Sequence, residues 1–417
     1  MRGLRLAATA SVAALLLSFP LLPASPREAP AQAKPAPAVP ASPWKEGVHG
    51  KGRLEVLPSG LAILHLAGTP EEMGAQHGTL LGEAVRGLVK DYLPKVLRGP
   101  RERALAKARS LEKGIPERHL REMKALAAAA GVTADDVLLG STVVELFGLH
   151  GCSSAAAFGP ATADGRAVVG RNLEWPDHGL LGRYGLVVAA RPEGRRPFVS
   201  LGFPALAGVV TGMNGDGLFT AELVAMDGAP ASEEKALRGV PWPILQRRLL
   251  EECGSADEAA ALVRSAPLTV PQNLLLADPG KGLVLEGAAG TCRERAAAAP
   301  GLVVATNYWA EDSEPPPWDP RYRGLCDAFA SLAGGKVDGD SMEKAIRAAS
   351  SVPPASAMNL QCGVFFPATL RARVSLGKPT ASKRPFTEID VAALLGVPAP
   401  ADRKAVVPVS PPAEEGR

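Results

Sequence analysis

The stretch Gly151-Cys152-Ser153-Ser154, together with Gly170-Arg171-Asn172-Leu173-Glu174-Trp175 shortly after it, decides the fold. Both runs predict β-strands, and Asp164-Gly165 between them is typical of the tight turn of a β-hairpin. If pairing is centred on that turn, residues whose numbers sum to about 329 face each other, and Cys152 lies about opposite Asp177. The return strand therefore brings its guanidinium and its carboxylate back toward the cysteine.

A thiol, a guanidinium and a carboxylate at one end of a hairpin favour nucleophile chemistry. A neighbouring cation such as Arg171 lowers the pKa of a thiol, and a carboxylate such as that of Glu174 can position an amine. The simpler alternative is a hairpin in which Cys152 is merely a small buried apolar residue. The hairpin alone does not decide between these interpretations.

Residues 49–151, ahead of the cysteine, are mostly helical in pattern. Thr69-Pro70-Glu71-Glu72 is a strong helix start, with threonine as the cap, proline at the first helical position and acidic residues in the first turn. Inside that helix Gly74, Gly78 and Gly82 recur every fourth residue, so they share one face. Because glycine weakens a helix by about 1 kcal/mol relative to alanine, the stripe predicts that another backbone packs closely against it.

After Cys152 the pattern changes to short apolar strands separated by Gly, Pro and Asp turns, with helical blocks between them. The predicted strands cover residues 166–172, 184–190, 197–201, 208–211, 217–224, 273–277, 283–286 and 301–305, and a last hairpin covers 363–376. The predicted helices cover residues 242–253, 255–265, 325–332 and 341–350. Alternating strand and helix blocks predict an α+β protein built of packed sheet and helix layers.

Four motifs occur in order: Gly-Cys-Ser-Ser from Gly151, Gly-Arg-Asn-Leu-Glu-Trp from Gly170, Gly-Met-Asn-Gly-Asp-Gly-Leu from Gly212 and Ala-Thr-Asn-Tyr-Trp from Ala305. Together they resemble the isopenicillin N acyltransferase-like (acyl-coenzyme A:6-aminopenicillanic acid acyltransferase) family of N-terminal-nucleophile (Ntn) hydrolases, to which penicillin V acylase and bile salt hydrolase are more distantly similar. The similarity runs from about Thr69 to Leu376.

The resemblance implies a four-layer αββα sandwich over residues 152–399, preceded by the mostly helical segment 49–151. It also implies that the chain cuts itself between Gly151 and Cys152, where the thiol attacks the preceding carbonyl and water then releases the ester. The new α-amine of Cys152, with an unperturbed pKa of about 7.7–8.0, would take the thiol proton and return it to the leaving amine. The mature protein would be a heterodimer of its own two chains, about 34–151 and 152–417.

The same resemblance implies roles for four further residues. Asn214 and Asn307 match the family's oxyanion-binding positions, although asparagine is also common in ordinary turns. Arg171 would stabilise the thiolate or bind a substrate carboxylate. Glu174 stands where relatives commonly carry Asp, and its carboxylate would anchor the α-amine of Cys152.

We therefore expect a cysteine Ntn hydrolase that cleaves or transfers an acyl group at a non-peptide amide bond through a Cys152 thioester. Its partner would be a small N-acylated substrate. Candidate walls of an apolar acyl pocket are Trp175, Phe219 and Trp309, although each also fits a place in the core. The sequence does not decide whether water or an amine accepts the acyl group.

Two other classes stay open. A papain-like cysteine hydrolase would need a histidine partner, and His150 and His178 are the histidines close to Cys152 in sequence. A non-catalytic exported binding protein would hold Cys152 in a disulfide. The other four cysteines, Cys253, Cys292, Cys326 and Cys362, could form two disulfides or remain thiols.

The chain ends have distinct compositions. Residues 1–33 are predicted to be a secretory signal peptide, because a short basic start precedes the apolar run from Leu6 to Leu22. The alternative is an uncleaved membrane anchor, but Pro20 interrupts the run. Residues 34–48 read as a Pro/Ala-rich linker, and residues 400–417 as a disordered tail. We therefore expect export to the periplasm or the extracellular space, without stable membrane insertion.

The charge balance and the motifs also bear on partners and cofactors. The chain has 46 basic and 43 acidic residues, and no Lys/Arg cluster is interleaved with aromatic residues. Nothing in this pattern indicates a nucleic-acid partner. No Cys or His pair has zinc-ligand spacing, and no phosphate-binding glycine loop is present. We therefore expect no metal and no nucleotide cofactor.

Overall fold

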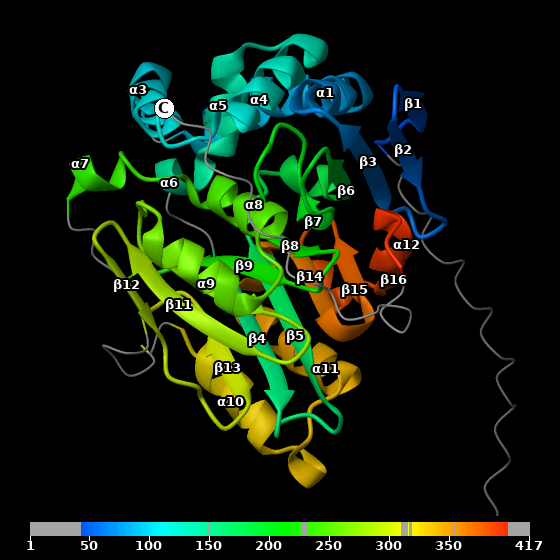
Figure 1. The fold of residues 1–417 in the computed structure, drawn as a ribbon, viewed down its shortest axis with the longest axis vertical. Coiled ribbons are helices and arrows are strands. Elements are labelled where there is room, and N and C mark those ends of the chain that lie inside the picture. The colour runs from blue at the N-terminus through cyan, green and yellow to red at the C-terminus, as the bar shows by residue number, and fades with distance from the viewer. Residues whose placement is uncertain are drawn as a thin grey trace, which may run out of the picture. The chain divides into compact units, whose positions relative to one another are not determined.

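The computed structural model describes residues 43–97, 99–147, 151–226, 232–309, 316, 319–353 and 355–398. The predicted signal peptide, most of the predicted linker, the predicted tail and His150 lie outside these residues. The described residues form two β-sheets with helices around them (Figure 1).

The larger sheet has ten strands among the described residues. In spatial order they are β1 (Gly47–His49), β2 (Gly52–Val56), β3 (Ala62–Gly68), β6 (Leu186–Pro192), β7 (Phe198–Gly202), β8 (Thr211–Asn214), β9 (Phe219–Val224), β10 (Gln272–Ala277), β11 (Gly282–Ala288) and β12 (Thr291–Glu294). The smaller sheet has six, in the order β13 (Leu302–Ala305), β4 (Gly151–Gly159), β5 (Gly165–Glu174), β14 (Asn359–Phe366), β15 (Arg371–Leu376) and β16 (Thr387–Asp390).

The helices fall into three groups along the chain. The first group is α1 (Pro70–Gly87), a π-helical turn (Leu88–Tyr92), α2 (Leu93–Val96), α3 (Arg101–Glu112), α4 (Glu117–Ala130), α5 (Ala134–Ser141) and α6 (Val143–Phe147). The second is α7 (Glu233–Ala236), α8 (Trp242–Glu252) and α9 (Ala256–Ser265). The third is α10 (Arg321–Ala330), α11 (Gly339–Ser350) and α12 (Val391–Leu395).

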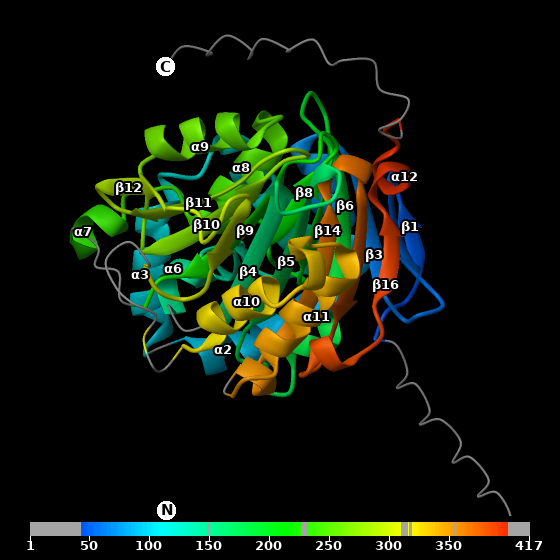
Figure 2. The same cartoon turned by 90° about the horizontal axis from the view of Figure 1, so that it is seen from below.

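Four layers are visible in Figure 2: α8 with α9, the ten-stranded sheet, the six-stranded sheet, and α10 with α11. The contacts agree, because α8 packs on β8 and β9, α11 packs on β5 and β14, and β4 packs on β9, β10 and β11 of the other sheet. Strands β9 and β11 are buried along their whole length, as expected for strands covered on both faces. The predicted α+β class and αββα sandwich are confirmed.

The amino-terminal segment is mostly helical, as predicted, but it shares a sheet with the rest of the protein. β3 pairs in parallel with β6, from Ile63 opposite Val187 to Gly68 opposite Pro192. The fold also begins inside the predicted linker 34–48, because Trp44 is only 9% exposed and its ring lies 5.8 Å from that of Tyr184. A buried aromatic ring anchors a stretch whose composition alone indicates a linker.

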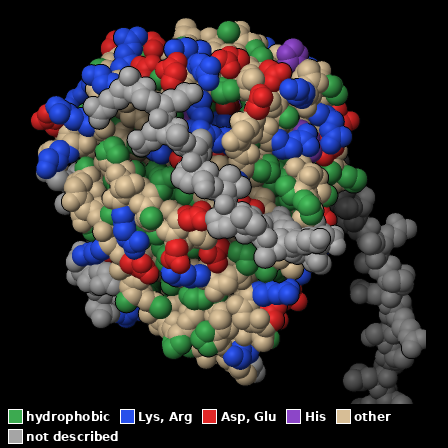
Figure 3. Space-filling model, viewed as in Figure 1, with side chains coloured by type: hydrophobic (Ala, Val, Ile, Leu, Met, Phe, Trp, Pro, Cys, Tyr) green, Lys and Arg blue, Asp and Glu red, His purple; other side chains and the backbone are tan. Residues whose placement is uncertain are grey.

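The surface carries charges of both signs. On the face shown in Figure 3, basic and acidic side chains are interspersed over the helices and loops. Large apolar side chains that are exposed within the described ranges are Val48 and Met226. The described residues contain no helix that is long and apolar enough to cross a membrane.

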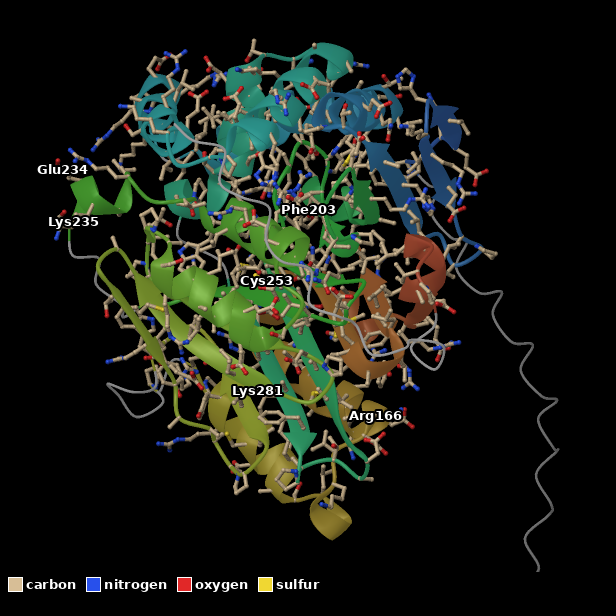
Figure 4. All side chains as sticks on the ribbon, viewed as in Figure 1. Arg166, Phe203, Glu234, Lys235, Cys253 and Lys281 are labelled. Atoms are coloured by element: carbon tan, nitrogen blue, oxygen red, sulfur yellow. The ribbon has the colours of Figure 1, made fainter. Side chains whose placement is uncertain are left out.

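Two local predictions are wrong. Cys152 pairs with Leu173 rather than Asp177, because β4 ends at Gly159 and β5 begins only at Gly165, so the connection is longer than a two-residue turn. Residues 208–210 are not a strand, since Val209 N donates to Pro243 O of α8 at 2.8 Å. In Figure 4, Arg166 marks the turn end of the hairpin, whereas Phe203 lies toward the amino-terminal helices.

The glycine stripe of α1 contacts α4, as predicted. A Cβ on Gly74 would lie 2.2 Å from Glu122 O, and one on Gly78 would lie 2.4 Å from Leu126 O. At Gly82 the nearest atom is Nη1 of Arg86, 3.1 Å away on a flexible side chain. Only the first two positions therefore require glycine for close backbone approach.

We expect Gly78→Ala to lower the free energy of unfolding by about 1–3 kcal/mol, because overpacking outweighs the helix propensity of alanine. Gly82→Ala is the matched control on the same face and should be neutral or stabilising by up to about 1 kcal/mol. Urea midpoints of the two variants measure this. Equal midpoints would contradict the close α1–α4 packing.

Candidate active site around Cys152

Cys152 is the second residue of β4 and is fully buried. Its neighbour Ser153 pairs with Asn172, whose Nδ2 donates to Ile346 O of α11 at 2.6 Å. Because side chains alternate along a strand, Cys152 and its partner Leu173 face the other way, toward the ten-stranded sheet. The thiol therefore lies between the two sheets.

Arg171 shares this inner face, two residues before Leu173. Its Nε donates to Thr211 Oγ1 of β8 at 3.2 Å, which joins the two sheets beside the nucleophile. Its Nη1 and Nη2 are buried and have no well-aligned hydrogen-bond partner among the described residues, although its side chain approaches the Cys152 thiol. The hairpin thus brings Arg171 to Cys152, as predicted.

Burial raises the pKa of the Cys152 thiol to about 11. The positive charge of Arg171 lowers this pKa, but the carboxylates of Glu174 and Glu222 raise it. The expected lowering of the thiol pKa is therefore wrong for the uncut chain, because loss of solvation outweighs the guanidinium. Near neutral pH the thiol keeps its proton.

The backbone nitrogen of Cys152 is held by a side chain. This nitrogen donates to Oδ1 of Asn307 at 2.7 Å, and Asn307 lies just beyond the end of β13. Arg321 Nη2 donates to the same oxygen at 2.7 Å, and Arg321 Nε donates to Asp319 Oδ1 at 2.7 Å. The amide nitrogen of Asn307 donates to Val224 O at 2.8 Å. In the uncut chain the side-chain oxygen of Asn307 therefore binds the nitrogen of the nucleophile, and its amide nitrogen binds β9.

Glu174 lies on the same face as Asn172, opposite the thiol. It accepts from Arg321 Nη1 at 3.2 Å and from Asn359 Nδ2 at 3.1 Å, while burial raises its pKa and Arg321 opposes the rise. A Cβ on Gly151 would lie 3.1 Å from the Glu174 Cβ and 3.3 Å from Arg321 Nη1. The side chains of Glu174 and Arg321 thus leave little room for a larger residue than glycine at position 151. The nitrogen of Cys152 contacts Asn307 and not Glu174.

Asn214 does not join this cluster. It follows Met213 at the end of β8 and faces the helical layer, where its Nδ2 donates to Leu250 O at 3.0 Å and to Cys253 O at 2.8 Å. Its Oδ1 accepts from the backbone nitrogens of Asp216 and Leu218. The structure gives Asn214 the role of a turn residue that caps α8, and an oxyanion role would need it on the other face of the sheet.

An apolar pocket of about 80 Å³ is lined in part by Leu173, the cross-strand partner of Cys152, but not by Cys152 itself. Of the three aromatic residues predicted to bind substrate, Trp175 lines it, and its Nε1 donates to Tyr92 Oη at 2.6 Å. Phe219 instead packs on Phe365 in the core with ring centroids 4.7 Å apart. The remaining one, Trp309, lies under the guanidinium of Arg293. Further pocket walls are Leu88, Val89, Leu93, Val96, Val143, Leu181, Phe203, Ala205, Leu206 and Val210.

Comparison with known proteins adds to this geometry. Residues 161–315 match the family model described as acyl-coenzyme A:6-aminopenicillanic acid acyl-transferase. The matched residues include Arg171, Glu174 and Asn307, whereas Cys152 lies before them.

An uncharacterized protein of Archaeoglobus fulgidus is 28% identical over 271 residues, covering 57% of this chain and 44% of that protein. The chain thus spans less than half the length of this curated relative. Among solved structures, an N-acylethanolamine-hydrolyzing acid amidase ortholog from Caenorhabditis elegans has a TM-score of 0.43 and 21% identity over 52% of this chain and 93% of its own. Penicillin V acylase from Agrobacterium tumefaciens has a TM-score of 0.41 and 14% identity over 59% and 88%. A variant of conjugated bile acid hydrolase from Clostridium perfringens has a TM-score of 0.40 and 12% identity over 59% and 95%.

The alternatives left open by the sequence can also be assessed. All five cysteines are free, so the hypothesis of a disulfide at Cys152 is wrong. His178 packs against Tyr92 with ring centroids 6.0 Å apart. Among the residues that the structure describes, no group of three or more His, Cys, Asp or Glu side chains could hold a metal ion.

Two buried carboxylates near the site were not predicted from the sequence. Glu222 is fully buried, and neither of its oxygens has a well-aligned hydrogen-bond partner among the described residues. Burial and the nearby charge of Glu145 raise its pKa well above the usual value, and Arg171 opposes this. Glu145 binds Trp242 N through one oxygen at 2.6 Å, and burial raises its pKa to about 7. A glutamate inside an otherwise apolar strand or helix is the sequence signal that could have revealed both.

The pKa of Glu145 predicts a pH dependence of stability. From about pH 4.5 to 7 the folded protein keeps a proton on Glu145 that the unfolded chain releases, so stability falls as pH rises through this window. Glu145→Gln should make thermal stability fall less steeply with pH between about 5 and 7. Glu117→Gln, an exposed glutamate on α4, is the control and should leave the slope unchanged. Parallel profiles for wild type and Glu145→Gln would contradict the assignment.

Proposed function

We propose that this protein is a self-processing cysteine amidase or acyltransferase of the Ntn type, with Cys152 as its nucleophile. The observation that carries the proposal is the 2.7 Å hydrogen bond from the Cys152 nitrogen to Asn307 Oδ1. That nitrogen becomes the catalytic α-amine if the chain is cut after Gly151, and a side chain already holds it beside its own thiol.

The cut itself follows from the same arrangement. The Cys152 sulfur adds to the Gly151 carbonyl, the peptide bond to the Cys152 nitrogen breaks, and a thioester forms between Gly151 and the sulfur. The thiol proton passes to the departing nitrogen, and water then hydrolyses the thioester to leave a carboxylate on Gly151. Glu174 and Arg321, packed against Gly151, are placed to fix its carbonyl in one orientation.

The acylation reaction repeats this chemistry on a substrate. With a free α-amine as base, the Cys152 sulfur attacks an amide carbonyl, the amine product leaves with the proton, and water or an acceptor amine releases the acyl group. The guanidinium of Arg171, which already lowers the pKa of Cys152, is placed to stabilise the thiolate that the buried site disfavours. Arg321, which sequence analysis did not identify, acts as a positioning residue for Asn307 and Glu174.

The substrate class follows from the pocket. Paired residues on neighbouring strands have Cβ atoms about 4.5–5.5 Å apart, so a pocket that Leu173 helps to line lies one residue away from Cys152. Its walls are almost entirely apolar, and a mainly hydrocarbon acyl group fits them better than a charged one. We therefore propose small N-acylated substrates with an apolar acyl group.

The same proposal includes the fate of the two chains and their location. After the cut, β3 belongs to one chain and β6 to the other, and their six paired positions keep both chains in one sheet. We propose a stable heterodimer on this basis. Export to the periplasm or the extracellular space is proposed from the basic and apolar pattern of residues 1–33.

A direct test is incubation of the purified protein with N-acyl 4-nitroanilides that carry linear acyl groups. We expect release of nitroaniline by the wild type, loss of release in Cys152→Ala, and an acyl adduct on the Cys152 peptide that neutral hydroxylamine removes. Wild-type protein that hydrolyses none of these amides and forms no adduct would refute the proposal. Cys362→Ala, which removes another buried thiol, is the control.

A second prediction separates the two asparagines. Asn307→Ala should lower turnover by about a hundredfold or more, because the nucleophile nitrogen loses its partner. Asn214→Ala should instead lower stability, since it removes the bonds to α8, while activity per folded molecule stays near normal. Measuring kcat together with a thermal midpoint distinguishes the cases. Equal losses of kcat in both variants would contradict the separation.

A further inference from the structure

One wall of the apolar pocket is the loop formed by residues 203–210, which joins β7 to β8. Phe203, Ala205 and Val210 of this loop line the pocket. Ala205 has a φ of +66°, a conformation that L-residues rarely adopt without external restraint. Something outside the loop must therefore hold it in place.

The restraint comes mainly from helix α8. Arg247 Nη1 donates to Ala207 O at 2.7 Å, and Gln246 Nε2 donates to Val209 O at 2.8 Å. On its other side, Ala207 N donates to Ser141 Oγ of α5 at 3.2 Å. The contact from Arg247 lies next to the residues that line the pocket.

Arg247 is itself fixed by a buried carboxylate from the amino-terminal segment. Its Nη1 and Nη2 donate to the two oxygens of Glu122 in α4, at 2.9 and 2.6 Å. Its Nε donates to Glu251 Oε1 at 2.8 Å. Glu122 is 2% exposed and Arg247 is 4% exposed, so water screens this paired fork little.

The Glu122–Arg247 pair therefore joins both halves of the pocket. The opposite wall, which includes Leu88, Tyr92 and Leu93, belongs to the amino-terminal segment, as Glu122 does. The loop and Arg247 belong to the part after Cys152. If the chain is cut after Gly151, Glu122 and Arg247 form an ion pair between two chains, and both of these chains contribute walls to the pocket.

We propose that Glu122 and Arg247 are positioning residues that set the fit of the pocket for short apolar acyl groups, through the hydrogen bond from Arg247 to Ala207. This rests on the proposed amidase function. Neither residue is near the reacting atoms, so their loss changes how the acyl chain is held and leaves the chemistry at Cys152 intact.

The test uses the full-length protein and the double variant Glu122→Leu with Arg247→Met. Replacing a buried ion pair by apolar side chains of similar volume usually preserves folding, whereas removing one partner leaves a buried charge unpaired. Arg247→Lys is the second variant, because a single ammonium keeps the charge but cannot reproduce the planar fork. Arg248→Met is the matched control on the same helix, where Arg248 pairs with Glu252 and does not contact the loop.

Two readouts are measured for each protein. We expect the affinity for butanoate, measured by calorimetry, to fall by about tenfold or more in the double variant and in Arg247→Lys, and to stay unchanged in Arg248→Met. With N-acyl 4-nitroanilides, KM for the butanoyl substrate should rise by a similar factor, while kcat and all constants for the acetyl substrate stay within about twofold.

The outcomes separate this inference from the proposed function. Butanoate that binds equally to wild type and both variants, or that does not bind the wild type, overturns the inference. An equal loss of kcat for acetyl and butanoyl substrates also overturns it, because that is a general structural defect. Butanoate binding that weakens as expected in a protein without amidase activity supports the role of the two residues in the pocket and refutes the amidase function.

Discussion

The hydrogen bond from the Cys152 nitrogen to Asn307 is the interaction on which the rest of the site depends. It requires β13 to pair with β4, so that the residues after β13 lie opposite the start of β4. It also requires Arg321, whose guanidinium binds Asn307, Glu174 and Asp319 at once. One buried arginine thereby holds both Asn307, which binds the Cys152 nitrogen, and Glu174, which lies beside Gly151.

The second constraint is that the segment before Cys152 cannot be separated from the segment after it. Pairing of β3 with β6 places it inside the larger sheet, and helix α4 contributes the carboxylate of Glu122 to Arg247. The apolar pocket has walls from both segments. A cut after Gly151 would therefore free the amine of Cys152 without dismantling either the sheet or the pocket.

Sequence patterns predicted packed sheet and helix layers, the glycine contact and the approach of Arg171 to Cys152, because these depend on local motifs and periodicity. The four-layer order and the place of Asn307 came only from the family resemblance. The sequence patterns failed where a property depends on burial or on strand parity. The thiol pKa is raised because solvation is lost, which a neighbouring arginine in sequence does not reveal. Asn214 faces the helices because Thr211, three residues earlier in the same strand, faces the other sheet. Arg321 reaches the site from a helix and could not be predicted from any motif.

The most direct measurement is the intact mass of the purified wild-type protein under denaturing conditions, combined with amino-terminal sequencing. We expect two chains that copurify, one of which begins at Cys152 with the residues Cys-Ser-Ser-Ala. For the variant Cys152→Ala we expect one uncut chain. An active wild-type protein that consists of a single chain running through Gly151 and Cys152 would contradict this expectation, as would a Cys152→Ala variant that is cut at the same bond.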